Sequence, residues 1–168
     1  MEGLGRLYDL SACITAGVVD LQAAQTGIRF NMEGCSGVDI VVVKGIGTAG
    51  DDPTFTLNEH TAYTSGTSAN LAAIDHWYIK SDTTALDGAE TWTKGTQTAA
   101  ATLTDATWAE TAMILVIPVE AASLSDGYTH ISLSVGDVGS NAQLGAILYV
   151  PRDLNAQRTP ANLPQRLT

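Results

Sequence analysis

The chain has 168 residues, of which 45% are hydrophobic and 15% are charged, and its formal net charge is −10. This length suits one domain with a substantial core, and the composition excludes a disordered chain. The longest strongly apolar run, Met113–Ile117, is far too short to span a bilayer, so we expect no membrane partner.

The first half of the chain predicts short strands. Residues 1–25 form a segment of uncertain structure, because the pattern fits a helical turn or a strand equally well. Runs rich in β-branched or aromatic residues at 26–31 and 38–44, separated by glycines, predict a strand, a turn and a second strand. Clean alternation at 54–57 predicts another strand.

The middle of the chain predicts one well-covered strand and two exposed ones. Residues 71–80 carry apolar side chains on both faces, so we expect this strand to be covered on both sides. The segments 91–94 and 96–103 are rich in threonine and fit edge strands.

Three core strands are predicted near the C-terminus. Residues 112–119 and 144–150 are apolar nearly throughout, and 130–135 alternates strictly. The loop 136–141 should join the last two strands into an antiparallel hairpin. The whole pattern predicts an all-β fold, a single antiparallel β-sandwich of 26–150 with jelly-roll-like or immunoglobulin-like Greek-key connections.

Residues 151–168 differ in kind from the rest and predict an extended C-terminal arm. Pro151, Pro160 and Pro164 each fix φ and lack an N–H group, so no helix fits this segment. Fully extended, the arm reaches about 55 Å, which exceeds the roughly 40 Å diameter of the domain. The arm is therefore long enough to cross to another subunit.

Charge is divided unevenly along the chain. The arm carries Arg152, Arg158 and Arg166 against Asp153, a net charge of +2, which leaves −12 for residues 1–150. The acidic body holds only three lysines, whereas affinity for nucleic acid comes from clustered Lys and Arg, so we expect no nucleic-acid partner.

The segment Gly45–Gly50 formally matches the glycine fingerprint of dinucleotide-binding folds. That chemistry needs a helix to begin at the glycines, so that its N-terminal N–H groups meet the pyrophosphate. Here Asp51 and Asp52 follow, and then a strand pattern, so both charge and structure favour an inter-strand loop and no cofactor.

No residue pattern indicates a metal site or an active site. The acidic pair Asp51–Asp52 and the segment 82–88 lack the spaced array of a calcium loop, and His60, His76 and His130 lack zinc-ligand spacing. No Gly-x-Ser-x-Gly motif or comparable constellation marks a nucleophile, so we expect no catalytic residue, no metal and no enzyme activity.

Two smaller sets of residues leave alternatives open. Cys13 and Cys35 could form one bridge, although two buried thiols are the commoner outcome in a chain with a sizeable core. Trp77, Trp92 and Trp108 fit core or interface positions, but Trp92 and Trp108 lie among Thr and Ala and could instead form a flat platform for sugars.

Several segments resemble the decoration or cement proteins of tailed-bacteriophage heads. They are Gly139–Ala146, Leu148–Leu154, Gln157–Leu163, Phe55–His60, Trp92–Lys94 and Leu124–Tyr128. The resemblance implies a β-rich virion protein, commonly a homotrimer, made in the host cytoplasm. Such a protein binds the exterior of the capsid and reinforces contacts between subunits of the major capsid protein.

The physical reading of the arm agrees with this implication. An acidic body suits the outside of a shell that is filled with DNA. We expect the arm to hold a neighbouring subunit or the capsid protein, its arginines pairing with carboxylates and its leucines acting as apolar anchors. The predicted interface residues are Arg152, Leu154, Arg158, Leu163, Arg166 and Leu167.

Two other functions remain open on sequence grounds. The first is a carbohydrate-binding sandwich, as in a phage head fibre that touches a host surface glycan, with the tryptophans as the platform. The second is a tail or neck protein of the same virion.

Overall fold

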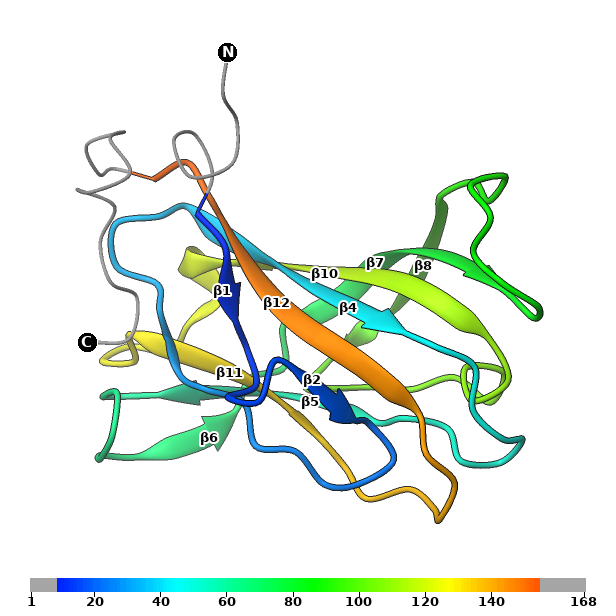
Figure 1. The fold of residues 1–168 in the computed structure, drawn as a ribbon. Coiled ribbons are helices and arrows are strands. Elements are labelled where there is room, and N and C mark those ends of the chain that lie inside the picture. Colours follow the sequence, from blue (N-terminus) through cyan, green and yellow to red (C-terminus); the bar gives the residue numbers. More distant parts are fainter. Residues whose placement is uncertain (1–8, 155–168) are drawn as a thin grey trace.

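The computed structural model, described for residues 9–154, is a sandwich of two antiparallel β-sheets (Figure 1). The predicted all-β sandwich is confirmed. Besides strands, the described residues contain one 3-10 turn, η1 (Ala121–Ser123). No helix in this part of the chain is long and apolar enough to cross a membrane.

The larger sheet contains seven strands within 9–154, in the order β1-β12-β4-β10-β7-β8, with β2 also pairing with β12. Strand β4 lies at its centre and pairs along its whole length with both β10 and β12. The bounds are β1 (Ser11–Ala12), β2 (Val18–Asp20), β4 (Gly37–Lys44), β7 (Ile74–Asp82), β8 (Thr93–Ala100), β10 (Ala112–Glu120) and β12 (Leu144–Arg152).

The smaller sheet contains five described strands in the order β3-β11-β5-β6, with β9 also pairing with β5. Strands β5 and β11 pair over six residues each and form its centre. The bounds are β3 (Phe30–Asn31), β5 (Phe55–His60), β6 (Ser68–Asn70), β9 (Thr102–Leu103) and β11 (His130–Val135).

Most connections between successive strands cross from one sheet to the other, although β5–β6 and β7–β8 stay within one sheet. Strands β3, β5 and β11 lie in the smaller sheet, whereas β4, β10 and β12 lie in the larger one. This alternation is the jelly-roll arrangement of two Greek keys. The prediction that 136–141 closes a hairpin is therefore wrong, because this loop carries the chain from β11 in one sheet to β12 in the other.

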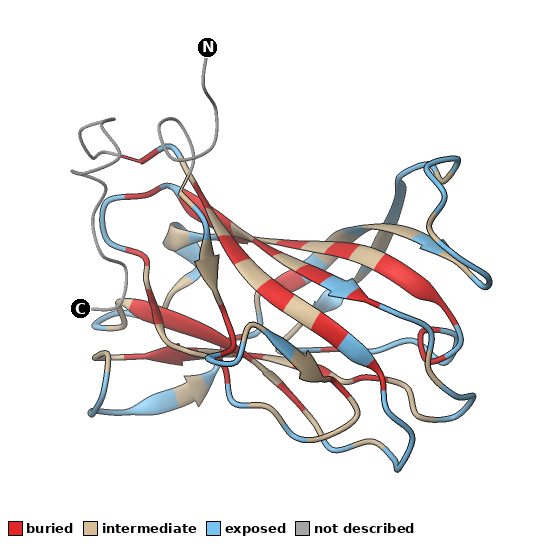
Figure 2. Ribbon diagram, viewed as in Figure 1, coloured by how far each residue is buried: buried red, intermediate tan, exposed pale blue. Residues whose placement is uncertain are grey.

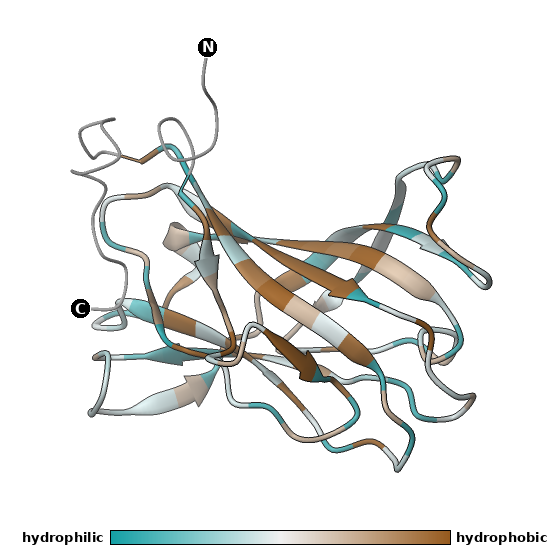
Figure 3. Ribbon diagram, in the orientation of Figure 1, coloured by the Kyte–Doolittle hydropathy of each residue, from teal (hydrophilic) through white to brown (hydrophobic). Residues whose placement is uncertain are grey.

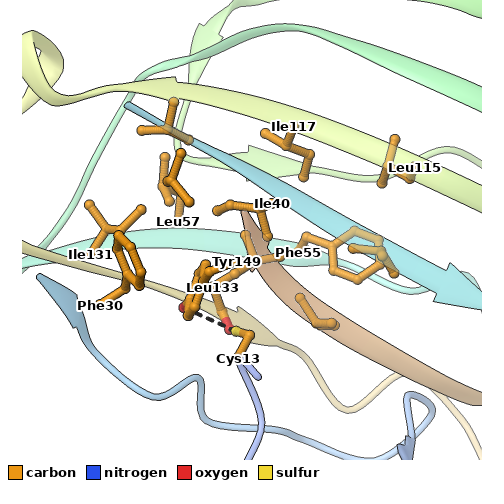
Figure 4. Packing of buried hydrophobic residues seen from close by; sticks show 14 of the residues in the cluster. Cys13, Phe30, Ile40, Phe55, Leu57, Leu115, Ile117, Ile131, Leu133 and Tyr149 are labelled. Carbon is orange, nitrogen blue, oxygen red and sulfur yellow. Dashed lines mark hydrogen bonds between the residues drawn. The ribbon is translucent and has the colours of Figure 1, made fainter. Parts of the chain in front are cut away.

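The core fills the space between the sheets. Buried residues alternate along β4, β10 and β12, as the colours of Figure 2 show, because successive residues of a strand point to opposite faces. Opposite them lie Phe55, Leu57 and Leu133 of the smaller sheet (Figure 4). The rings of Phe30 and Tyr149 meet across the gap with centroids 5.0 Å apart.

The start of the described chain belongs to the sandwich. Strands β1 and β2 both pair with β12, and the side chains of Cys13 and Leu21 are fully buried in the core. The predicted segment 1–25 of uncertain structure thus contributes the short strands β1 and β2 to the larger sheet. Residues 1–8 lie outside the described part.

The end of the described chain is also built into the fold. Strand β12 continues through Pro151 to Arg152, two residues into the predicted arm, and pairs there with Val38 and Gly37 of β4. Leu154 is buried against the core. The remainder of the predicted arm, 155–168, lies outside the described residues.

Candidate functional site

The outward side of the larger sheet is a broad apolar surface. Ile40 and Val42 of β4 are fully buried, so the alternate residues Val41 and Val43 point outward, and β10 and β12 behave in the same way. We call this surface the outer apolar face. It consists of Val41, Val43, Ile114, Val116, Pro118, Ala146, Leu148 and Val150.

Strand register brings these side chains together. Val43 lies between Ile114 of β10 and Ala146 of β12. One step along the strands, Val41 lies between Val116 and Leu148. Directly opposed side chains in antiparallel strands have Cβ atoms about 5 Å apart, so the face is continuous.

The other sheet has a polar outward side. Its outward residues on β5 and β11 are Thr56, Asn58, His60, Ser132 and Ser134. These side chains are polar, but His60 and Ser132 are buried, so this side of the sheet is partly covered. Figure 3 shows the contrast, because β4, β10 and β12 are hydrophobic along most of their length whereas the strands of the smaller sheet alternate.

Aromatic side chains border the outer apolar face on its β7 side. Tyr78 lies opposite Val116, and these two residues line a shallow apolar hollow together with Trp92, whose side chain is 50% exposed. Lys80 Nζ lies 5.2 Å from the ring centre of Trp92, and Lys94 Nζ lies 5.8 Å from that of Tyr78. Both lysines hold cation–π positions.

A cluster of charged side chains lies on the outer side of the sheet at one end of β12. The guanidinium of Arg152 lies 3.2 Å from Asp39 Oδ1 and donates a hydrogen bond of 2.8 Å to Glu120 Oε1. Burial raises the pKa of Asp39, and nearby Glu120 raises it further, while the positive charge of Arg152 opposes both effects. The cluster therefore keeps a formal net charge of −1, because one arginine faces two carboxylates.

These contacts bear on the predicted interface residues. Arg152 was expected to pair with carboxylates of another subunit, and the structure gives it Asp39 and Glu120 of its own chain. Leu154 was expected to anchor on a neighbour, and it is buried in the core. The other four predicted interface residues lie outside the described part: Arg158, Leu163, Arg166 and Leu167.

The tryptophans occupy different environments. Trp108 is 5% exposed, and its ring packs against Phe55 and Trp77 at centroid distances of 6.1 and 6.2 Å. It is a core residue and cannot form a sugar platform. Trp77 is partly buried over Gly95 of β8, where a Cβ atom would collide with the indole. Only Trp92 of the three is exposed enough to meet a ligand.

The glycine-rich segment Gly45–Gly50 is a loop that leads from β4 toward β5, with no helix after it. Gly47 N donates to Ala109 O, and Lys44 Nζ donates to Gly45 O and Ala109 O at 2.7 and 3.2 Å. Burial lowers the pKa of Lys44 to about 8, although Asp52 acts in the opposite direction. The predicted inter-strand loop is confirmed.

The two aspartates after this loop fasten neighbouring loops. Asp51 Oδ2 accepts hydrogen bonds from the backbone and side-chain nitrogens of Asn141, which lower its pKa, and Asp52 accepts one from Ala109 N. Among residues 9–154, no group of three or more His, Cys, Asp or Glu side chains is arranged to hold a metal ion.

One histidine pairs with a serine that the sequence did not connect to it. His60 Nε2 lies 2.8 Å from Ser132 Oγ, and His60 Nδ1 lies 2.7 Å from Ser68 Oγ. This is the hydrogen-bond geometry of a nucleophile and its base. Both His60 and Ser132 are buried, however, so the serine hydroxyl is not presented to a substrate, and the cluster fastens β5, β6 and β11 together.

The two cysteines are buried thiols, as the commoner alternative predicted. Cys13 Sγ lies 3.0 Å from Tyr149 Oη and 3.4 Å from Leu133 O, and burial raises the pKa of the thiol to about 11. A thiol with so high a pKa is inert as a nucleophile at neutral pH. Cys13 therefore serves packing in the core.

Sequence reasoning missed the outer apolar face as a surface. The signal was present in 112–119 and 144–150. In each run both alternating sets of positions are apolar, so each strand has two apolar sides. Such runs are typical of strands covered on both faces. The register with β4, which turns separate runs into one surface, was not readable from the sequence.

No protein-family model, no curated protein and no solved structure matches this chain. We therefore interpret the outer apolar face, its aromatic border and the charge of the molecule from their own chemistry.

Proposed function

We propose that the protein is a non-enzymatic structural protein of a tailed-bacteriophage virion. It binds the exterior of the assembled capsid and reinforces contacts between subunits of the major capsid protein, as decoration or cement proteins do. It acts as a homo-oligomer, for which the resemblance implies a trimer.

The observation that carries this proposal is the outer apolar face. A catalytic protein needs a concave site with convergent polar groups, whereas an assembly protein needs a broad surface that another protein covers. Val41, Val43 and Val116 belong to a surface of the second kind. Larger exposed apolar patches on soluble proteins mark interaction sites.

Charge supports a position outside the shell. Residues 1–154 carry a net charge of −12, because the only charged residues after Leu154 are Arg158 and Arg166. Packaged DNA would repel such a body from the inside of the capsid. The jelly-roll fold is compatible with this function, but it also occurs in lectins, so the fold alone does not discriminate.

Capsids of the phage that encodes the chain, produced without it, provide the direct test. The purified full-length protein should co-sediment with these capsids and saturate at a fixed number of copies per capsid subunit. Decorated capsids should also withstand a higher temperature before they release DNA. If the protein stays in the supernatant at micromolar concentration, the proposal fails.

Trp92 favours a second candidate, which is carbohydrate binding. Its exposed indole, next to Tyr78 and Val116, offers the flat aromatic surface on which sugar rings stack. A glycan array would identify a ligand, and Trp92→Ala should abolish that binding. Trp108→Ala is not a useful variant for this purpose, because Trp108 lies in the core.

A tail or neck position in the same virion is the third possibility. A tail or neck protein would also need a surface that binds another protein. Imaging of labelled protein on intact particles separates head from tail directly.

A further inference from the structure

Two lysines and two aromatic residues gather on the outward side of β7 and β8. Lys94 lies opposite Tyr78 in the strand register, and its Nζ is 5.8 Å from the centre of the tyrosine ring. Lys80 is the next outward residue of β7, and its Nζ is 5.2 Å from the ring centre of Trp92, which directly precedes β8. We call these four residues the lysine–aromatic site. It borders the outer apolar face at Val116, which lies opposite Tyr78.

The two lysines of this site are available to an anion. Among residues 9–154, Arg29 and Lys44 donate to backbone carbonyls, and Arg152 lies beside two carboxylates. The ammonium groups of Lys80 and Lys94 form neither an ion pair nor a hydrogen bond with any residue in this part of the chain. They are therefore the open positive charges of a body, residues 1–154, whose net charge is −12.

The two acidic residues of β7 are already engaged. Asp75 Oδ1 lies 2.5 Å from His76 Nδ1, and Asp82 Oδ1 accepts hydrogen bonds from the backbone N–H and the hydroxyl of Thr84. Distant carboxylates act weakly, because charges in water are screened beyond about 8 Å at physiological ionic strength. The acidic body therefore does not prevent an anion from binding beside the two lysines.

The aromatic rings provide a surface for a sugar ring. Trp92 and Tyr78 are 50% and 38% exposed, and together with Val116 they line a shallow hollow of about 380 Å³. That volume lies within the roughly 300–1,000 Å³ of small-molecule sites. Exposed flat rings with apolar faces suit the C–H face of a pyranose. Because the lining is apolar, recognition of charge falls to the two lysines beside it.

We propose that the lysine–aromatic site binds an acidic sugar, a pyranose ring that carries a carboxylate. The ring stacks on the aromatic pair, and the carboxylate accepts charge-assisted hydrogen bonds from the lysines. A nucleic-acid strand fits less well, because its phosphates would continue past the two lysines over an acidic body. This proposal rests on the carbohydrate-binding candidate above and adds to it the requirement for negative charge.

Calorimetric titration of the purified full-length protein tests the site. The probes are the acidic oligosaccharides trigalacturonate and sialyllactose, each compared with its own methyl ester, which keeps the rings and removes the charge. At least one acid should bind at millimolar concentration or below. Its ester should bind at least about tenfold more weakly, because it cannot form the charge-assisted hydrogen bonds. Triglutamate, which carries charge without a sugar ring, should bind no better than the ester.

Substitutions assign the binding to this site. Lys80→Gln and Lys94→Gln should each weaken binding of the acid by about fivefold to tenfold and leave binding of the ester unchanged. Lys80→Arg keeps the charge and should retain most of the affinity. Trp92→Ala should abolish binding of both acid and ester, and native circular dichroism of each variant verifies that it is folded.

The possible negative results have different meanings. If the esters bind as tightly as the acids and Trp92→Ala abolishes both, the carbohydrate-binding candidate stands and the acidic-sugar proposal fails. If triglutamate binds as tightly as the acids, the lysines recognise charge alone, as in an acidic protein segment, and the proposal also fails. If neither acid binds at millimolar concentration, the proposal is wrong, and the glycan array still decides on neutral sugars. Capsid co-sedimentation is a separate measurement, so its failure leaves these results intact.

Discussion

At the scale of single residues, Tyr149 joins the two sheets through its hydroxyl. It lies on β12 and donates a hydrogen bond of 2.9 Å to Ile28 O, while Leu133 N on β11 donates to it at 3.2 Å. Burial raises the pKa of the phenol well above its ordinary value, and the neighbouring Cys13 thiol acts in the same direction. The hydroxyl is therefore neutral and serves as both donor and acceptor.

Tyr149→Phe should destabilise the protein by about 1–3 kcal/mol, because the substitution leaves the Leu133 N–H and the Ile28 carbonyl without this partner in the core. Urea unfolding measures the change. Tyr128→Phe is the control, because Tyr128 is only partly buried, in the loop before β11, and its substitution should cost less than about 0.5 kcal/mol. Equal effects in the two variants would contradict the role assigned to Tyr149.

His60 makes stability depend on pH. Burial, together with the charges of Arg29 and His130 and against that of Glu59, lowers its pKa from 6.5 to about 4. The unfolded chain therefore takes up a proton near pH 6.5 that the native chain accepts only near pH 4, so the contribution of His60 to stability is lost as pH falls through this window. The lowered pKa therefore exists only in the folded chain, where His60 of β5 contacts Ser132 of β11.

The unfolding free energy of the wild type should therefore fall more steeply between pH 6.5 and 5 than that of His60→Gln. Denaturant titrations at several pH values measure both slopes. His76→Gln serves as the control, since His76 lies on β7 beside Asp75 and away from this cluster. Parallel slopes for the wild type and His60→Gln would contradict the prediction.

At the scale of elements, Trp108 lies in the loop before β10 and packs against both sheets. Its ring contacts Phe55 of β5 and Trp77 of β7. Trp108→Ala should cost about 3–5 kcal/mol, because a large buried ring leaves a cavity. Trp92→Ala should cost less than about 1 kcal/mol, since Trp92 is half exposed. Thermal unfolding compares the two variants, and a similar loss in both would refute this assignment.

The strands themselves were predictable, but their partners were not. Alternation located β5 and β11, and continuous apolar runs located β10 and β12, because side-chain periodicity is a local property. Sheet membership depends on which distant strands meet, so the loop 136–141 was wrongly predicted to close a hairpin. The outer apolar face could not be predicted for the same reason, since Val43 and Ala146 meet only through the register of β4 and β12.

At the scale of the whole molecule, the described sandwich extends through Leu154 and does not stop at Pro151. Pro151 and Arg152 belong to β12, and Leu154 is buried. Deleting 151–168 should lower the unfolding free energy by about 2 kcal/mol or more relative to deleting 155–168, since the longer deletion also removes the Arg152 ion pairs and the burial of Leu154, which alone contributes about 1.5–3 kcal/mol. Urea titrations of the two truncated proteins measure the difference, and equal stability would show that 151–154 contribute nothing to the fold.

The segment 155–168 then carries a charge that the body lacks. Arg158 and Arg166 give it +2 against −12 for residues 1–154. If this segment holds an acidic neighbour on the capsid, binding should weaken as salt rises, because exposed ion pairs are screened within about 10 Å at 0.1 M ionic strength. The double variant Arg158→Gln/Arg166→Gln should bind more weakly at low salt and show a flatter salt dependence. Co-sedimentation at 0.05 to 0.5 M salt, a range chosen around that screening length, measures both effects.

Val43→Lys provides the contrast, because it changes the outer apolar face and leaves the charge of 155–168 intact. Its capsid binding should therefore keep the wild-type decline with salt. A salt response of the double variant equal to that of the wild type would mean that the body, and not the basic segment, makes the contact.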